Sequence, residues 1–169
     1  MKKALVIIDM QNDFVDGALA NPMAQAIVTP IAEYMKAFDG DLIATRDTHA
    51  ETYLASSEGK YLPVVHCVHG THGWEISAPI QEVLQARNAM ILDKPTFGYL
   101  GWGMLGAYTD VELVGTCTDI CVVSNALILK AMFPDMNVRV NAPLCAGTTQ
   151  ENHEAALAVM ACCQVEILK

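Results

Sequence analysis

The sequence predicts an α/β fold with three layers, in which a doubly wound, Rossmann-like chain builds a six-stranded parallel sheet. Short, continuous apolar runs recur along the chain, as in parallel strands that are buried on both faces. Segments with apolar residues at i, i+3 and i+4 follow most of these runs, as in helices that cover such a sheet. The chain has 169 residues, of which 53% are hydrophobic, so we expect a single domain spanning residues 1–169.

The expected strands and helices alternate in chain order. Strands are expected at Ala4–Ile8, Leu42–Thr45, Ala89–Leu92, Glu112–Gly115, Val138–Val140 and Val165–Leu168. Helices are expected at Met23–Phe38, Ile76–Ala86, Asp119–Phe133 and Gln150–Cys163. The stretch from Arg46 to Trp74 shows no convincing long helix or strand, and long irregular segments in compact domains are usually functional. It contains four of the five histidines: His49, His66, His69 and His72.

Composition argues against several classes of partner. The net charge is −9 and no cluster of lysine and arginine occurs, which argues against a nucleic-acid partner. No apolar run approaches the roughly 18 residues of a membrane span, and the run after the first two lysines is too short for a signal peptide. The six cysteines form no CxxC pair, as expected of free thiols in a cytoplasmic protein. The high apolar content suggests a subunit interface, so we expect a homo-oligomer.

Polar residues follow four of the predicted strands. Asp9, Asp47 and Lys94 come after the first three, and the fourth runs into Cys121 near the start of a helix. In open α/β sheets, ligands bind beyond the carboxyl ends of the strands. Any of these residues alone has an ordinary structural explanation, as a turn residue or a buried thiol. Their convergence on one edge of the sheet predicts an active site.

A thiol, an acid and a lysine suit attack on an amide-like carbonyl. Only the thiolate of Cys121 attacks carbonyls well, and both Lys94 and the start of a helix favour the thiolate. Asp9 can take the thiol proton and pass it to a leaving amine. Backbone N–H groups in the turn before the helix can stabilise the oxyanion. We therefore expect a cysteine hydrolase with Asp9, Lys94 and Cys121 as catalytic residues.

The irregular stretch contains a candidate metal site. Residues i and i+2 of an extended segment point to the same side, so Asp47 and His49 can bind one ion. His66 would complete the set, and Glu58 lies between them in sequence. Zinc is the first expectation for such mixed ligands, with manganese or iron as alternatives. A solvated polar loop is the competing interpretation.

Five motifs in chain order resemble the isochorismatase-like cysteine hydrolases, especially the nicotinamidases. They are Ile-Ile-Asp-Met-Gln-Asn-Asp-Phe (7–14), Thr-Arg-Asp-Thr-His (45–49), His-Cys-Val-His-Gly-Thr (66–71), Asp-Lys-Pro (93–95) and Gly-Thr-Cys-Thr-Asp-Ile-Cys-Val (115–122). They extend over nearly the whole chain. The resemblance implies a six-stranded parallel sheet and the same Asp9, Lys94 and Cys121 triad.

The resemblance also implies a cofactor and details of the site. A cis peptide would join Thr116 and Cys117, so that the N–H groups of Cys117 and Cys121 form the oxyanion hole. A divalent metal would be held by Asp47, His49 and His66, with Glu58 as the best match for a further ligand. Phe14 would flank the substrate ring.

The expected substrate is a small, neutral, nicotinamide-like amide, which is cleaved to a carboxylate and ammonia through a thioester. Phe97 and Tyr99 are expected to line its pocket with Phe14, and small aromatic sites favour flat ligands. N-carbamoyl amides and ureides are alternative substrates. A phosphoacceptor receiver domain also places carboxylates and a lysine at strand ends. Here, however, Met10 follows Asp9 where a receiver has paired acids, and Lys94 follows the third strand.

Overall fold

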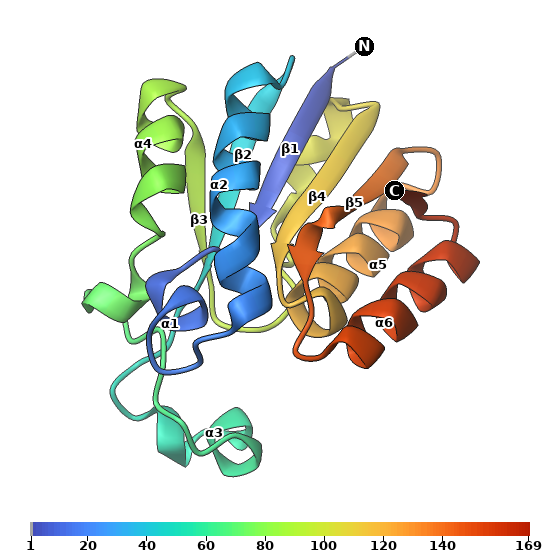
Figure 1. Cartoon of the computed structure of the whole chain (residues 1–169). Helices are drawn as coiled ribbons and strands as arrows, with labels where there is room; N and C mark the ends of the chain where they lie inside the picture. The colour runs from blue at the N-terminus through green and yellow to red at the C-terminus, as the bar shows by residue number, and fades with distance from the viewer. Residues whose placement is uncertain (1) are drawn as a thin grey trace.

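The computed structural model describes residues 2–169 and contains one six-stranded sheet with the order β3-β2-β1-β4-β5-β6 (Figure 1). Every neighbouring pair of strands is parallel. The predicted fold class is therefore confirmed. The strands are β1 (Lys3–Ile8), β2 (Asp41–Asp47), β3 (Met90–Lys94), β4 (Asp110–Thr116), β5 (Asn137–Ala146) and β6 (Glu166–Leu168).

Six α-helices and four helical segments of other types connect the strands in the described chain. The α-helices are α1 (Asn12–Val15), α2 (Pro22–Ala37), α3 (Ser57–Tyr61), α4 (Ala78–Ala86), α5 (Val123–Met132) and α6 (Gln150–Cys162). The 3₁₀ segments are η1 (Tyr53–Ala55), η2 (His72–Trp74) and η3 (Trp102–Ala107). A π-helical turn, η4 (Thr118–Val122), runs directly into α5. None of these helices is long and apolar enough to cross a membrane.

The sheet separates two hydrophobic cores. On one face, alternate β1 residues such as Leu5 and Ile7 pack against α2 and α4. On the other face, Val6 and Ile8 pack with α5, α6 and η3. The two-residue period of a strand produces this division, because successive side chains point to opposite faces. The continuous apolar runs in the sequence therefore reflect a sheet that is covered on both sides.

The chain reverses its winding direction between β1 and β4. From β1 it proceeds outward through β2 to β3, and β4 then starts the other half on the opposite side of β1. In this topology the crevice at the carboxyl ends of the two central strands is the usual ligand site. Figure 1 shows the short helices α1 and α3 beyond these carboxyl ends.

A glycine permits the close approach of β1 and β4 at this edge. Gly115 has φ of 118°, in a region that favours glycine, and a side chain there would collide with the backbone carbonyl of Ile8. The register of β4 on β5 also shifts between Leu113 and Gly115. This irregular end of β4 leads into the turn that contains Cys117 and Cys121.

Candidate active site and metal site

The three expected catalytic side chains meet at the carboxyl edge of the sheet. Lys94 ends β3, Asp9 follows β1, and Cys121 comes from the π-helical turn η4. The Lys94 Nζ atom lies 2.6 Å from Asp9 Oδ2 and 3.4 Å from Cys121 Sγ. All three residues are buried. The structure thus brings an acid, an ammonium group and a thiol into direct contact, away from bulk water.

Burial has the largest single effect on the pKa of each of these three side chains. It raises the pKa of Asp9, although the positive charge of Lys94 acts in the opposite direction. Burial also raises the pKa of Cys121 well above its usual value. The negative charge of Asp9 adds to this effect, and Lys94 only partly offsets it. Burial would lower the pKa of Lys94, but the negative charges of Asp9, Cys121 and Asp47 outweigh it and raise that pKa.

Lys94 favours the Cys121 thiolate, as expected, but burial and the negative charge of Asp9 outweigh its effect. The lysine itself is held as a cation by its ion pair with Asp9. A resting state with a neutral Cys121 thiol and a Lys94 ammonium group follows from these directions. The thiol proton must then be removed during the reaction, and Asp9 is the adjacent acceptor.

The turn before Cys121 has the geometry that the resemblance implied. The peptide bond between Thr116 and Cys117 is cis. Cys117 precedes η4 with an extended backbone (φ −87°, ψ 140°), and Cys121 lies within that turn. Both cysteines line the same cavity, beside the space where a carbonyl would react. Burial raises the pKa of the Cys117 thiol to about 11, so this second thiol is protonated at neutral pH.

A cavity of about 550 Å³ opens beside Cys121. Phe14 and Phe97 line it, as expected. Tyr99 does not: its ring packs edge-on against buried Trp102, with 5.1 Å between ring centroids, and its backbone N–H donates to Asn125. The remaining lining residues are Leu19, Ala20, Asn21, Pro22, Asp47, Glu58, Tyr61, Leu62, Thr116, Cys117, Ile120 and Thr148.

The lining is mostly apolar, and it carries two carboxylates, Asp47 and Glu58. Within residues 2–169, no lysine or arginine lines the cavity. An anionic ligand would therefore find no countercharge on the wall, whereas a flat neutral ligand would find aromatic and aliphatic surfaces. Several wall residues, including Asn21, Tyr61 and Thr148, were not expected from sequence, because they belong to separate segments that only the fold brings together.

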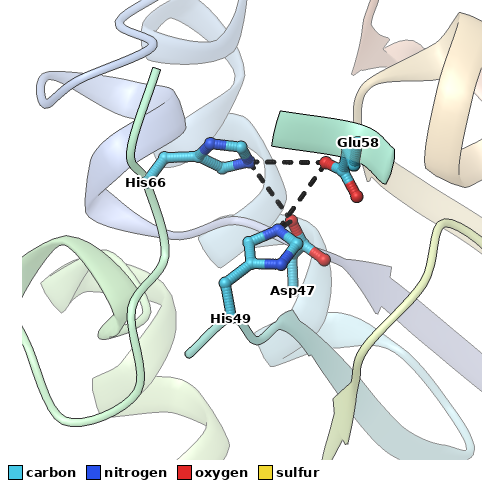
Figure 2. A group of neighbouring side chains, drawn as sticks. All are labelled: Asp47, His49, Glu58 and His66. Carbon is cyan, nitrogen blue, oxygen red and sulfur yellow. Dashed lines mark hydrogen bonds and ion pairs between the residues drawn. The ribbon is translucent and has the colours of Figure 1, made fainter. Parts of the chain in front are cut away.

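Figure 2 shows the four proposed metal ligands pointing toward one another. One donor atom from each of Asp47, His49, Glu58 and His66 lies within 4.8 Å of all the others. The Nε2 atoms of His49 and His66 lie 2.9 and 3.5 Å from Asp47 Oδ2. They lie 3.7 and 3.8 Å from Glu58 Oε1. Two imidazole nitrogens and two carboxylates form a donor set that suits a divalent metal.

Details of the ligands also fit a metal. His66 Nδ1 donates to the Val64 carbonyl at 2.7 Å, which orients the ring and leaves Nε2 facing the cluster. Burial alone would raise the pKa of Asp47. Hydrogen bonds from His49 and His66 outweigh burial and hold that pKa well below its usual range, so the carboxylate is ionised.

Asp47 connects the metal cluster to the triad. Its Oδ2 atom faces the histidines, whereas Oδ1 lies 3.6 Å from Lys94 Nζ and has no hydrogen-bond partner. The backbone of Asp47 is fixed by the buried amide of Gln11. Gln11 accepts from the Asp47 N–H at 2.7 Å and donates to its carbonyl at 2.9 Å. Gln11 was not among the expected site residues, although it lies within the first motif of the sequence.

The comparisons with known proteins cover nearly the whole chain. Residues 3–169 match the isochorismatase domain. A nicotinamidase/pyrazinamidase of Mycobacterium tuberculosis is 28% identical, with 98% of each chain covered. An uncharacterised isochorismatase family protein of Bacillus subtilis is 30% identical, with 93% of each covered.

Solved structures give the same result. A pyrazinamidase/nicotinamidase from Streptococcus mutans superposes with a TM-score of 0.85 at 29% identity, covering 99% of this chain and 100% of that one. A zinc complex of a pyrazinamidase from Pyrococcus horikoshii gives 0.83 at 27% identity, covering 100% and 99%. Because the match extends from β1 to the last strand and includes every segment that contributes to the site, this chain belongs to the isochorismatase family.

Proposed function

We propose that the protein is a cysteine-dependent amidohydrolase that cleaves a small nicotinamide-like amide to a carboxylate and ammonia. The observation that carries this proposal is the contact of Lys94 with both Asp9 and Cys121 at the wall of an apolar cavity. The similarity to nicotinamidases and pyrazinamidases supports the substrate class. Neither the N-carbamoyl alternative nor a receiver domain is favoured by these relatives.

The reaction follows from the arrangement of protons and charges. Asp9 takes the thiol proton as Cys121 Sγ attacks the amide carbonyl carbon. The resulting oxyanion is stabilised by the backbone N–H groups of Cys117 and Cys121, and Lys94 stabilises the negative charge around the sulfur. The tetrahedral intermediate collapses when protonated Asp9 gives its proton to the leaving nitrogen. Ammonia departs and a thioester remains.

Hydrolysis of the thioester restores the enzyme. Water enters where ammonia left, and Asp9 takes a proton from it as its oxygen attacks the acyl carbon. The carbon–sulfur bond then breaks, the carboxylic acid leaves as its carboxylate, and the Cys121 thiol is protonated again. One acid thus acts in both half-reactions.

The same proposal assigns a divalent metal to Asp47, His49 and His66, with Glu58 as a further ligand. Zinc is our first choice, because the donors combine nitrogen and oxygen and because a related pyrazinamidase binds zinc. A bound metal would supply a Lewis acid at the cavity wall, where Asp47 and Glu58 lie.

We further infer a single hydrolase domain that acts as a homo-oligomer in the cytoplasm. The domain assignment is supported by the family match over residues 3–169. Free cysteines support a reducing compartment, since all six thiols are unpaired in the described chain. Exposed apolar side chains support an interface between copies: Leu100 is 79% exposed and Val159 is 49% exposed.

Ammonia release tests the proposed activity. Purified protein is assayed with nicotinamide, pyrazinamide and an N-carbamoyl amide, and the Cys121→Ala variant is compared with the wild type. We expect the two ring amides to be hydrolysed and the variant to lose at least about a hundredfold in kcat, because the thiol that contacts Lys94 and forms the thioester is removed.

Cys162→Ala is the matched control, because this cysteine is exposed on α6 and takes no part in the site. It should retain wild-type activity. Hydrolysis of a peptide or an anionic ester without turnover of any small amide would refute the substrate class. Persistence of more than about one percent of activity in Cys121→Ala would refute the covalent mechanism.

A further inference from the structure

The two carboxylate oxygens of Asp9 have different partners. Oδ2 pairs with Lys94 Nζ at 2.6 Å, and Oδ1 accepts a hydrogen bond from Thr45 Oγ1, also at 2.6 Å. The backbone N–H of Asp9 points at the same threonine, 3.3 Å from both its carbonyl oxygen and its hydroxyl oxygen. Asp9, Thr45 and Lys94 are all fully buried.

Thr45 belongs to the second motif of the sequence, but neither the triad nor the metal cluster uses it. Inside β2, most of its neighbours are apolar and pack into the two cores. Strand alternation places Thr45 on the same face as Asp47, and the parallel pairing of β1 with β2 brings it beside the end of β1. A buried hydroxyl must be hydrogen-bonded, and here its acceptor is the proposed catalytic acid.

The backbone explains why the acid needs such support. Asp9 lies just beyond β1 with φ of 49°, so the pairing of β1 no longer fixes its side chain. The ion pair with Lys94 holds only one carboxylate oxygen, which leaves some freedom of rotation about the Cβ–Cγ bond. The bond from Thr45 to the second oxygen removes this freedom.

We propose that Thr45 is a positioning residue for the hydrolase: its hydroxyl locks the rotation of the Asp9 carboxylate, so that one oxygen stays at Lys94 and the thiol. This inference rests on the proposed function for the reaction that Asp9 serves. It assigns to Thr45 no contact with the substrate. The hydroxyl acts through Asp9.

The charges around Asp9 give the direction of the effect. Lys94 faces it from β3, Asp47 from β2 and the Cys121 thiol from η4. Burial raises the pKa of Asp9, whereas Lys94 and the Thr45 hydroxyl lower it. Removal of the hydroxyl should therefore keep the acid protonated up to a higher pH, in addition to loosening its orientation.

Thr45→Val and Thr45→Ser test the proposal as a pair. Valine has nearly the same shape without the hydroxyl, and serine keeps the hydroxyl without the methyl group. With nicotinamide as substrate, we expect Thr45→Val to lower kcat at least about tenfold with little change in KM, because substrate contacts are intact. The acid limb of kcat/KM should move up by about one pH unit, as expected for a lost hydrogen bond to a charged group. Thr45→Ser should stay within about threefold of the wild type at every pH.

A second measurement needs no substrate, so failure of the Thr45 proposal is distinguishable from failure of the proposed hydrolase activity. Protein labelled with ¹³C at the aspartate carboxyls is titrated by NMR, and the Asp9 signal is assigned by its loss in Asp9→Asn. The Asp9 midpoint should be higher in Thr45→Val than in the wild type and Thr45→Ser. Equal Asp9 midpoints in wild type and Thr45→Val would overturn the proposal. Equal losses of activity in the valine and serine variants would overturn it as well, because they would indicate packing and not hydrogen bonding.

Discussion

Lys94 is the residue on which the site's charge balance depends. It is fully buried, and a buried ammonium group is tolerated only when it is paired. Asp9 Oδ2 lies 2.6 Å from its Nζ atom, Asp47 Oδ1 lies at 3.6 Å and the Thr96 carbonyl accepts at 3.2 Å. Lys94 thus holds one carboxylate from the triad and one from the metal cluster. A change of charge on either carboxylate therefore alters the electrostatic environment of the other through this lysine.

The raised pKa of Asp9 predicts where activity is lost on acidification. Asp9 must be ionised to accept the thiol proton. Burial raises its pKa above the usual 3.8, although Lys94 opposes the effect. As pH falls through this raised pKa, the base becomes protonated and kcat/KM should decline. The acid limb should therefore lie above the ordinary aspartate range in a pH–rate profile.

Circular dichroism at each pH distinguishes protonation from unfolding. Spectra should remain unchanged over the range in which kcat/KM falls. An acid limb at or below pH 4 would contradict the role of Asp9 as a buried base, since an exposed aspartate titrates there.

At the scale of elements, the sequence predicted the long segments and missed the short ones. Five of the six strands and the four longer helices lie within a few residues of their expected positions, because apolar periodicity is informative over such lengths. β5 extends to Ala146, well beyond Val140, and its second half was missed because Asn141 and Pro143 interrupt the apolar run.

The short helices α1 and α3 carry too few residues for a periodic signal. α3 has five residues, and its detectable sign is the Ser56 hydroxyl, which caps it by accepting from the Gly59 N–H at 2.9 Å. For the site, residue types and strand ends were sufficient to select the triad and the cluster. Three features depend on packing that one-dimensional patterns do not contain. They are the burial that raises the Cys121 thiol pKa, the contact of Thr45 with Asp9, and the packing of the half-buried Tyr99 ring against Trp102.

Because α3 carries Glu58, it makes the fourth metal ligand testable on its own. Glu58→Gln keeps the side-chain length and removes the negative charge. We expect the zinc affinity to fall by about ten- to a hundredfold, because a charged oxygen donor is lost while Asp47 and the histidines remain. Competition with a chromogenic chelator measures the dissociation constant.

Glu51→Gln is the control for this variant. Glu51 is exposed in the same irregular stretch and lies outside the cluster. Its substitution should leave the affinity unchanged. An unchanged dissociation constant in Glu58→Gln would show that Glu58 is a neighbour of the metal site and not a ligand.

For the whole molecule, the metal cluster joins parts of the chain that the sheet does not connect directly. Asp47 ends β2, His49 follows it, Glu58 belongs to α3, and His66 lies in the loop before η2. Below the carboxyl edge in Figure 1, the segment with α3 extends away from the main body. The contacts among these four side chains link this segment to the edge of the sheet.

Metal binding should therefore stabilise the folded protein as a whole. A ligand that binds only the native state adds RT ln(1 + [L]/Kd) to its stability, about 2.7 kcal/mol at a hundredfold excess over Kd. For a domain of this size, that corresponds to a rise of roughly 5–10 °C in the unfolding temperature. Differential scanning calorimetry of the zinc-loaded protein, before and after treatment with a chelator, measures the shift.

The His66→Ala variant should lose most of this rise in unfolding temperature, because the ring removed is nearly fully buried in the cluster, with a side-chain exposure of 2%. His72→Ala should retain it, because that side chain is 84% exposed and lies outside the cluster. Equal shifts in the two variants, or no shift in the wild type, would mean that the cluster does not bind the metal in the folded state.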